Sequence, residues 1–166
     1  LAAVGGGAWD PGARALAAPV VVARRPAEAG IAVVCGGLGG VMEAAARGAA
    51  GAGGDVIGII PGDDPAAANP HCTHVVATGV GYARNLAVVA SGDAVVAIGG
   101  EWGTLSEIAF ARRIGRPVIA LDSWTVKGVG PMAQAPGIEV VADPAGAVAA
   151  VERALATGSS PAARGG

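Results

Sequence analysis

The stretch AVVAIGGEWGTLSEIAFARRIG, residues 94–115, joins an apolar run, a glycine-rich turn and a helical segment in direct succession. Its pattern predicts a buried strand over residues 93–98, a turn over 99–103 and a helix over 104–114. A buried strand that passes through a tight turn into a helix is the repeating unit of parallel α/β proteins. This stretch therefore points to the α/β class, and the rest of the chain decides whether the unit is repeated.

The order of strand, turn and helix recurs along the whole chain. Further strands are predicted over residues 1–4, 31–35, 55–60, 74–77, 117–121 and 138–141, and further helices over residues 11–28, 41–52, 82–90 and 144–157. The strands are continuous runs of valine, isoleucine and alanine, which is typical of strands covered on both faces. We predict one doubly wound, Rossmann-like α/β domain over residues 1–158, with a parallel sheet of about seven strands, helices on both faces and a flexible tail over 159–166. Pro19 and Pro26 are expected to kink or shorten the first helix.

The composition is that of one compact domain. The chain has 166 residues, and its 52% hydrophobic against 14% charged residues argues against disorder. The net charge of −2, with no block of Lys and Arg, predicts no nucleic-acid partner. Mean hydropathy is +0.55, but the longest apolar runs, such as residues 16–23, are too short to cross a bilayer. With no signal peptide visible, we predict a cytoplasmic protein that binds no membrane.

Cys35 and Cys72 are the only cysteines in the sequence. Without a secretion signal they are expected to be free thiols rather than a disulfide. Neither belongs to a CxxC pair, so we predict no structural zinc. The spacing of His71 and His74 directs them to opposite faces of an extended segment, and no third ligand is evident. The sequence therefore predicts neither a metal site nor a cofactor.

Five glycine-bearing turns follow predicted strands, over residues 5–7, 36–40, 61–64, 79–81 and 99–103. In a parallel sheet they share one edge, which is where such folds bind ligands. The turns at 36–40 and 99–103 also lead into helices, whose free N–H groups suit a phosphate. The candidate phosphate-binding residues of these turns are Gly36, Gly37, Gly39, Gly40 and Gly99. Neither turn is a Walker motif and residues 5–10 lack the dinucleotide spacing, which argues against nucleoside triphosphate hydrolysis and against NAD or FAD binding.

Glu107 has two interpretations that the sequence leaves open. Thr104 followed three residues later by Glu107 is a capping box, in which the carboxylate only secures a helix end. A carboxylate beside a glycine-lined turn also suits catalysis on a bound phosphate ester. Arg84 falls near the first turn of its helix, where the dipole disfavours a cation, so we expect it to face a phosphate or a carboxylate. Glu43, in the first turn of another helix, is better explained by the helix dipole.

Other residues in the edge loops have weaker indications of function. Asp63 and Asp64 follow a Pro-Gly pair, which is typical of a surface loop, although they could also contact a ribose, a base or Mg²⁺. Trp102 and Trp124, like Trp9, are expected either to stack on a base or pterin or to pack in a dimer interface.

Four segments carry a family resemblance, in this order: CGGLGGVMEAAARGA (35–49), IIPGDD (59–64), GYARN (81–85) and GGEWGTLSEI (99–108). Together they resemble the LOG ("lonely guy") family, long labelled "possible lysine decarboxylase". Within it they are most similar to the short bacterial branch that includes molybdenum-cofactor carrier proteins. The resemblance covers about residues 1–150, and it implies a Rossmann-like fold and a homodimer or larger homo-oligomer.

The resemblance also implies a function. LOG members hydrolyse the N-glycosidic bond of nucleoside 5′-monophosphates, such as AMP or cytokinin nucleotides, to base and ribose 5-phosphate. They do not decarboxylate lysine, and no pyridoxal phosphate is implied. The carrier members bind molybdenum cofactor, also a phosphate ester, without transforming it. The expected protein is thus a phosphoribohydrolase or, as the alternative, a non-catalytic carrier or sensor, and in either case it binds a small phosphorylated ligand.

In LOG enzymes an arginine and the glutamate of a PGGxGTxxE motif are catalytic, and these positions match Arg84 and Glu107. Phosphate binding carries over to Gly100, Gly103 and Thr104. The chain departs from the family pattern in three places. Gly99 stands where the motif has proline, Glu101 where it has its second glycine, and Asn85 where a lysine commonly follows the arginine.

Overall fold

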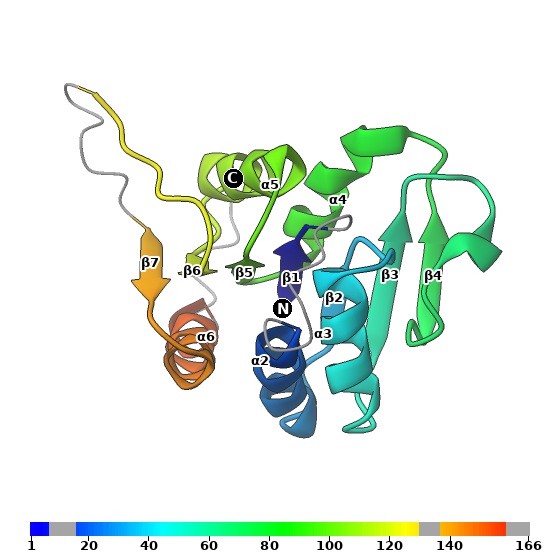
Figure 1. Cartoon of the computed structure of the whole chain (residues 1–166), viewed down its shortest axis with the longest axis horizontal. Helices are drawn as coiled ribbons and strands as arrows, with labels where there is room; N and C mark the ends of the chain where they lie inside the picture. The colour runs from blue at the N-terminus through cyan, green and yellow to red at the C-terminus, as the bar shows by residue number, and fades with distance from the viewer. Residues whose placement is uncertain (7–15, 130–136, 159–166) are drawn as a thin grey trace.

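The computed structural model describes residues 1–6, 16–129 and 137–158, and in these residues seven strands form one sheet (Figure 1). The strands are β1 (Ala2–Gly5), β2 (Val33–Cys35), β3 (Val56–Ile60), β4 (His74–Ala77), β5 (Val95–Ile98), β6 (Val118–Leu121) and β7 (Ile138–Val141). Their order across the sheet is β4-β3-β2-β1-β5-β6-β7, and each neighbouring pair is parallel. The predicted parallel sheet is therefore confirmed.

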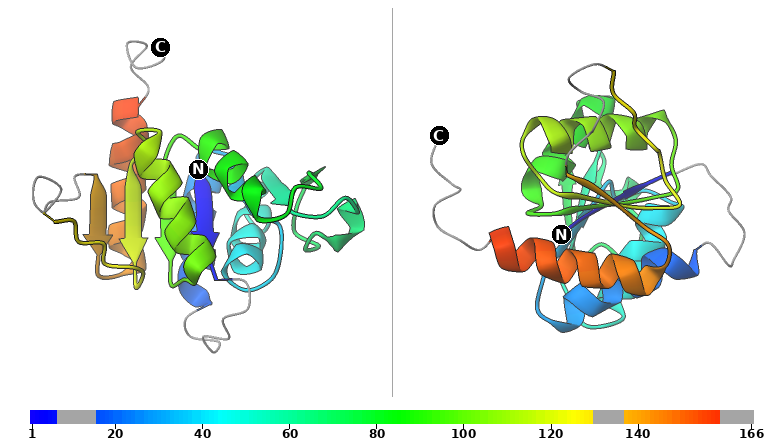
Figure 2. Two further views of the ribbon diagram at one scale, coloured as in Figure 1. Left: turned by 90° about the horizontal axis from the view of Figure 1, so that it is seen from above. Right: turned by 90° about the vertical axis from the view of Figure 1, so that its left-hand side faces the viewer.

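Helices cover both faces of this sheet (Figures 1 and 2). They are α2 (Ala17–Glu28), α3 (Val41–Ala50), α4 (Arg84–Ser91), α5 (Trp102–Arg113) and α6 (Pro144–Gly158), with two short 3₁₀ helices, η1 (Pro65–Ala67) and η2 (Gly81–Ala83). α4 and α5 pack on one face, and α2, α3 and α6 pack on the other. This arrangement confirms a doubly wound, Rossmann-like domain. Among the helices in the described part of the chain, none is long and apolar enough to span a membrane.

The central strands are buried on both faces because successive side chains of a strand point to opposite sides of the sheet. In β5, Val95 and Ala97 pack in one cluster with Ile108 of α5. Val96 and Ile98 belong to the cluster on the opposite face, with residues of α2, α3 and α6. Each buried valine or isoleucine contributes roughly 1.5–3 kcal/mol. Burial on both faces explains why the strands are uninterrupted apolar runs in the sequence.

Helix α2 runs without interruption from Ala17 to Glu28 in the described residues. Pro19 falls in its first turn, where backbone N–H groups have no partner within the helix, so the missing donor costs little. Pro26 lies in the last turn, and its carbonyl accepts the N–H groups of the residues that leave the helix. The helix ends where the sequence pattern predicts, so neither proline shortens it at that end. The predicted start at residue 11 lies outside the described residues.

Helices α2 and α3 pack closely together at Gly48. A Cβ atom at Gly48 would lie 2.8 Å from the Cα atom of Val20 and 2.9 Å from its carbonyl carbon. Such short contacts with backbone atoms are relieved only when the helices move apart, because no flexible side chain is there to rotate. Glycine is therefore required here by helix packing, at a helical position where alanine is intrinsically favoured.

We expect Gly48→Ala to destabilise the protein by about 1–3 kcal/mol, the usual cost of overpacking, even though alanine favours a helix by about 1 kcal/mol over glycine. Urea unfolding followed by circular dichroism measures the change in the free energy of unfolding. Gly146→Ala is the matched control, because Gly146 lies at the start of α6 and an added Cβ would meet atoms no closer than 3.4 Å. The control should be neutral or stabilising. A Gly48→Ala variant as stable as the wild type would contradict the close packing of α2 on α3.

Candidate functional site

The candidate site lies at the carboxyl edge of the sheet, where the strand order reverses between β1 and β5. Doubly wound folds bind ligands in a crevice at this point. The crevice forms because the connections that follow the two adjacent strands lead to opposite sides of the sheet. A pocket of about 650 Å³ opens there, a size typical of small-molecule sites. It is lined by Gly5, Gly6, Leu38, Met42, Tyr82, Arg84, Asn85, Glu101, Trp102, Gly103, Thr104, Ser106 and Glu107. Turns that follow β1, β2 and β5 thus contribute to one pocket.

Arg84 and Glu107 form a buried ion pair in this pocket. Arg84 is the first residue of α4 and Glu107 lies in the second turn of α5, so the packing of the two helices brings them together. Arg84 Nη1 lies 3.7 Å from Glu107 Oε1, and the two residues are only 7% and 5% exposed. This separation is longer than a hydrogen bond. The charges attract each other, while hydrogen-bonding capacity remains for a ligand.

Burial changes the protonation of both members of the pair. Desolvation raises the pKa of Glu107 to about 7, although the attraction of Arg84 opposes the shift. Burial likewise lowers the pKa of Arg84, against the attraction of Glu107 and Cys35. With a pKa near 7, Glu107 is able to donate or accept a proton at neutral pH, which is a property of general acids and bases.

Helix α5 begins two residues earlier than the sequence predicts, and the predicted capping box is wrong. The first residue of α5 is Trp102, and Glu101 is its N-cap, in an extended conformation and without a side-chain cap hydrogen bond. Glu107 therefore lies in the second turn, too far along the helix to cap its start. The reason is the turn ahead of it: Gly99 and Gly100 have φ angles of 59° and 131°, which only glycine adopts easily. They turn the chain sharply, so the helix begins at once.

Two buried polar atoms of this pocket have no hydrogen-bond partner among the described residues: Thr104 Oγ1 and Arg84 Nε. Thr104 is only 2% exposed. An unpaired buried polar atom costs about 1–3 kcal/mol, and such atoms in native proteins usually pair with a water or a ligand. A hydroxyl and a guanidinium are thus available together, which favours an anionic ligand.

The starts of the two helices beside the pocket are not equivalent. At α3, the N–H of Val41 already donates to the carbonyl of Gly6, at 3.3 Å. At α5, the first helical hydrogen bond runs from Leu105 to Glu101, at 3.1 Å, and the N–H groups ahead of it have no partner within the helix. Those groups belong to Trp102, Gly103 and Thr104. The start of α5 is therefore the stronger anion site.

The position of Arg84 depends on the absence of a side chain at Gly36. A Cβ atom at Gly36 would lie 2.6 Å from Arg84 Nη2, so a larger residue would displace the guanidinium. Asn69 secures the same turn through two hydrogen bonds. Its backbone N–H donates to the carbonyl of Gly37 at 2.8 Å, and its side-chain amide donates to the carbonyl of Leu38 at 3.1 Å. The turn is thus a defined support for Arg84.

The glycines predicted to bind phosphate fall into three groups. Gly103, with Thr104, lines the pocket at the start of α5. Gly99 and Gly100 line a neighbouring pocket. The others shape the turn after β2, and Leu38 is the residue of that turn that lines the first pocket. They are Gly36, Gly37, Gly39 and Gly40.

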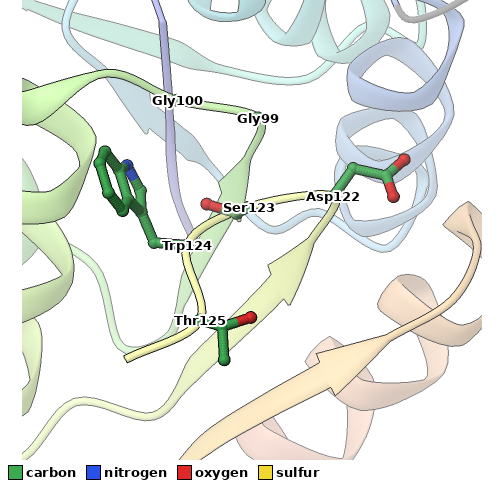
Figure 3. A pocket seen from close by; sticks show the side chains of 6 residues that line it. All are labelled: Gly99, Gly100, Asp122, Ser123, Trp124 and Thr125. Carbon is green, nitrogen blue, oxygen red and sulfur yellow. The ribbon is translucent and has the colours of Figure 1, made fainter. Parts of the chain in front are cut away.

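The neighbouring pocket, of about 390 Å³, lies between the turns that follow β5 and β6 (Figure 3). It is lined by Gly99, Gly100, Asp122, Ser123, Trp124 and Thr125. Ser123 Oγ is buried and unpaired within the described residues, and it points to the same side as the Trp124 ring, whereas Asp122 points away (Figure 3). Asp122 has a φ of 47°, a left-handed conformation that is uncommon outside glycine and frequent at functional turns.

Two tryptophans connect the pockets. Trp102 lines the first and Trp124 the second, and their ring centroids are 5.2 Å apart with the planes tilted by 38°. Trp124 Nε1 donates to the carbonyl of Glu101 at 3.1 Å, which ties its ring to the start of α5. Glu101 lines the first pocket and is exposed, so water screens its charge. Of the two roles predicted for these tryptophans, this location favours ligand stacking.

Asp63, Asp64 and Glu43 do not line the two pockets. Asp64 caps η1, because the N–H of Ala66 donates to Asp64 Oδ1 at 2.9 Å. Glu43 lies in the first turn of α3, as its dipole interpretation predicts.

The histidines lie away from the pockets. His71 and His74 are not among the lining residues, and His74 Nδ1 instead contacts the hydroxyl of Thr73 at 2.9 Å. Across residues 1–6, 16–129 and 137–158, no three His, Cys, Asp or Glu side chains are grouped to hold a metal ion. Trp9 and the predicted tail over 159–166 lie outside the described residues.

Asn85 is a pocket residue whose role the sequence pattern misses. It is buried beside Arg84, 5% exposed. Its side-chain amide donates to Ser106 Oγ at 3.3 Å, and that hydroxyl donates to the carbonyl of Gly103 at 2.6 Å. This chain of hydrogen bonds ties the start of α4 to the start of α5. The sequence does show a polar residue directly after Arg84 in the predicted first turn of a helix. It does not show that Ser106 is the hydrogen-bond partner of this residue.

The fold defines a Rossmann-like protein with a pocket at the carboxyl edge of its sheet. Residues 2–157 match the SLOG cluster4 family, and the chain belongs to that family. The family resemblance seen in the sequence is therefore confirmed.

Solved structures are similar over nearly the whole chain. The molybdenum cofactor binding protein from the phototrophic bacterium Rippkaea orientalis is 28% identical, with a TM-score of 0.81 over 93% of this chain and 95% of that one. The molybdenum cofactor carrier protein from Chlamydomonas reinhardtii is 31% identical, with a TM-score of 0.79 over 93% and 96%. DNA processing protein A from Streptococcus pneumoniae is 20% identical, with a TM-score of 0.64 over 89% and 60%, and shares the fold alone.

An uncharacterized protein from Archaeoglobus fulgidus is 45% identical over 95 residues. The matched region spans 57% of this chain and 62% of that protein, so the chain covers less than two thirds of this relative.

The raised pKa of Glu107 makes the stability of the protein depend on pH. Below pH 4.5, the carboxyl group is protonated in both the folded and the unfolded state, and burying it carries no charge penalty. Between pH 4.5 and 7 the unfolded chain releases this proton while the folded protein keeps it. The free energy of unfolding therefore falls as pH rises, by about 1.4 kcal/mol per pH unit from this group, and the loss is complete above the folded pKa.

Glu107→Gln, which cannot ionise, tests this dependence. The stability of the wild type relative to Glu107→Gln should fall by on the order of 3 kcal/mol as pH rises from 4.5 to 7. Chemical unfolding at a series of pH values measures it. Glu152→Gln, at an exposed position of α6, reports any general effect of removing a carboxylate. If wild type and Glu107→Gln lose stability in parallel, Glu107 does not titrate near neutral pH.

Proposed function

We propose that this protein binds and carries a small phosphorylated ligand, of the nucleotide or pterin-cofactor class, in the pocket at the start of α5. The observation that carries the proposal is the pair of unpartnered buried atoms, Thr104 Oγ1 and Arg84 Nε. Together with the first N–H groups of α5, they supply the hydrogen bonds and the charge that a phosphate monoester requires. Molybdenum cofactor is such an ester, so the similarity to the Rippkaea and Chlamydomonas proteins supports this ligand class.

We infer that the ring system of the ligand lies beside the two tryptophans. With the phosphate at the start of α5, Trp102 and Trp124 offer aromatic surface on the side of the neighbouring pocket. Offset or tilted stacking of aromatic rings adds about 0.5–1.5 kcal/mol beyond burial. The unpaired hydroxyl of Ser123 supplies a polar contact for a heteroatom of the ring.

The second candidate function is hydrolysis of the N-glycosidic bond of a nucleoside 5′-monophosphate. The observation that favours it is the buried Glu107, whose pKa of about 7 suits proton transfer. In this reaction Arg84 orients the substrate, and Glu107 stabilises the cationic ribosyl transition state or positions the water. We rank it second because Glu101 and Asn85 depart from the motif of the LOG hydrolases.

A homo-oligomer and a cytoplasmic location stay predictions, as does the absence of a nucleic-acid partner. Apolar side chains are exposed on the pair of helices α4 and α5. They are Leu86 of α4, Phe110 of α5 and Ile114, which directly follows α5. A second copy of the chain is the occupant that we propose for this surface.

Thr104→Val tests whether the Thr104 hydroxyl binds the ligand or supports the fold. It replaces an unpaired buried hydroxyl by a methyl group of the same shape, so the free protein should be as stable as the wild type or more stable, by up to about 1–3 kcal/mol. Affinity for inorganic phosphate and AMP should fall about tenfold or more, since one hydrogen bond to a charged group is lost. Calorimetric titration and urea unfolding measure the two effects.

Thr78→Val is the matched control, because Thr78 Oγ1 donates to the carbonyl of Ile60 at 2.8 Å and does not line the pockets. This variant should lose about 1 kcal/mol of stability and keep its affinity. A Thr104→Val variant that behaves like the control would contradict a phosphate at Thr104.

Incubation with AMP and related monophosphates distinguishes the carrier from the hydrolase. A carrier binds the nucleotide and releases no free base, which chromatography detects directly. A hydrolase releases base, and Glu107→Gln should abolish the release while AMP still binds, because the amide keeps the shape of the carboxylate but cannot transfer its proton. Release that persists unchanged in Glu107→Gln would exclude Glu107 as the catalytic group.

A further inference from the structure

Cys35 and Cys72 share one site beside the turn over residues 36–40. Cys35 ends β2, and its partner across the β2–β3 pair is Gly58. Cys72 precedes β4, and its Sγ occupies the space that a side chain at Gly58 would fill, 2.6 Å from the Cβ position. Neighbouring strands are about 4.8 Å apart and paired residues face the same side. The two thiols, both free, therefore lie side by side in one cluster.

The two thiols differ in access and in acidity. Cys35 is buried in the core cluster of α2 and α3, whereas Cys72 packs at its margin and is partly exposed. The hydrogen bond with Cys35 lowers the pKa of Cys72, and the same contact together with burial raises the pKa of Cys35. A thiolate that solvent reaches is the one that reacts with oxidants. Cys72 is therefore the more reactive of the two thiols.

We propose that Cys72 and Cys35 form a redox-active pair in which hydrogen peroxide oxidises Cys72 and Cys35 then closes an intramolecular disulfide. In the first step the Cys72 thiolate attacks one peroxide oxygen, an S–O bond forms, the O–O bond breaks and hydroxide leaves. In the second step the Cys35 sulfur attacks the sulfenic sulfur of Cys72, an S–S bond forms and water leaves. Overall, two thiols lose two electrons and two protons, and the peroxide is reduced to two waters.

The pair is linked to the ligand pocket by hydrogen bonds. The N–H of Cys72 donates to the carbonyl of Asn69 at 3.2 Å, and Cys35 directly precedes the turn over residues 36–40. Asn69 also holds the carbonyls of Gly37 and Leu38, and Leu38 lines the pocket. A disulfide brings the two sulfurs to about 2.05 Å, which is closer than any contact between separate thiols. Bond formation therefore moves the turn against which Arg84 is held.

Oxidation is consequently expected to weaken phosphate binding. Gly36, next to Cys35, lies so close to the Arg84 guanidinium that it accepts no side chain, so a shift of the turn displaces the cation from its ligand. This second part rests on the proposed function, whereas disulfide formation itself does not.

Mass spectrometry of the full chain tests disulfide formation. After treatment with hydrogen peroxide and alkylation under denaturing conditions, the protein should lose both free thiols. Its mass should fall by two hydrogen atoms, its peptides containing Cys35 and Cys72 should be joined, and dithiothreitol should reverse the change. Two thiols that stay free, or a wild-type monomer that accumulates sulfinic acid without a disulfide, would overturn the proposal. These measurements need no variant, so they do not depend on how a substitution affects folding.

Two variants assign the roles of the thiols. In Cys35→Ser, Cys72 should still be oxidised and should accumulate as a sulfenic acid that dimedone traps. In Cys72→Ser, the buried Cys35 should react with peroxide at least tenfold more slowly than Cys72 does in the wild type. Equal reactivity of the two single variants would overturn the assignment of Cys72 as the attacking thiol.

Titration with inorganic phosphate and AMP, before and after oxidation, tests the link to the pocket. The disulfide form should bind several-fold more weakly than the reduced form, and Cys35→Ser should show no such change. A disulfide that forms with no change in affinity would overturn the link while the redox pair stands. If neither form binds phosphate or AMP, the proposed function fails. The test of disulfide formation is unaffected, because it does not depend on ligand binding.

Discussion

The rest of the site depends on the buried ion pair between Arg84 and Glu107. Two opposite charges removed from water lose hydration that their attraction seldom restores in full. For them to meet, α4 must begin at Arg84, α5 must present its second turn, and position 36 must lack a side chain. Apolar residues of similar volume in place of a buried ion pair are often at least as stabilising. The pair is therefore better explained by a ligand that uses these charges than by the stability of the fold.

The parallel sheet is the part of the structure that could be predicted best from the sequence. Strands covered on both faces must be apolar at every position, so the central strands are visible as continuous runs such as Val95–Ile98. The same topology brings the turns after different strands to one edge. Arg84 and Glu107 could be located through the family motif, because the motif reflects a pairing between two helices that no local pattern shows.

The start of α5 shows where local patterns fail. Thr104 and Glu107 have the residue types and the spacing of a capping box, and a pattern of four residues contains nothing that contradicts it. The preceding glycines, with positive φ angles, begin the helix at Trp102 instead. The hydroxyl of Thr104 thereby loses its expected backbone partner and becomes an unpaired donor in the pocket. The failed prediction and the candidate phosphate site thus have the same structural cause.

The remaining features depend on contacts between distant parts of the chain. Asn69 supports the turn after β2 from a loop 31 residues further along the chain, and Cys72 occupies the space that Gly58 leaves empty. A single sequence shows an asparagine in a polar loop and a glycine in a strand, but not that each is matched to a partner. Gly58 acts by leaving room for the Cys72 side chain, and Asn69 acts by holding the carbonyls of Gly37 and Leu38 in place.

Glu101 connects the geometry of the site with the choice between carrier and hydrolase. As the N-cap of α5 it lies where the helix dipole favours a negative charge, so it stabilises the empty protein. A bound phosphate at the same helix start meets this carboxylate as a like charge, screened by water because Glu101 is exposed. In the proposed phosphate site, Arg84, Thr104 and the backbone would hold the ligand against a moderate repulsion. A carrier has to release its cargo as well as bind it, and a binding site with a built-in repulsion meets both requirements, whereas a hydrolase gains nothing in its transition state from a negative charge beside the phosphate.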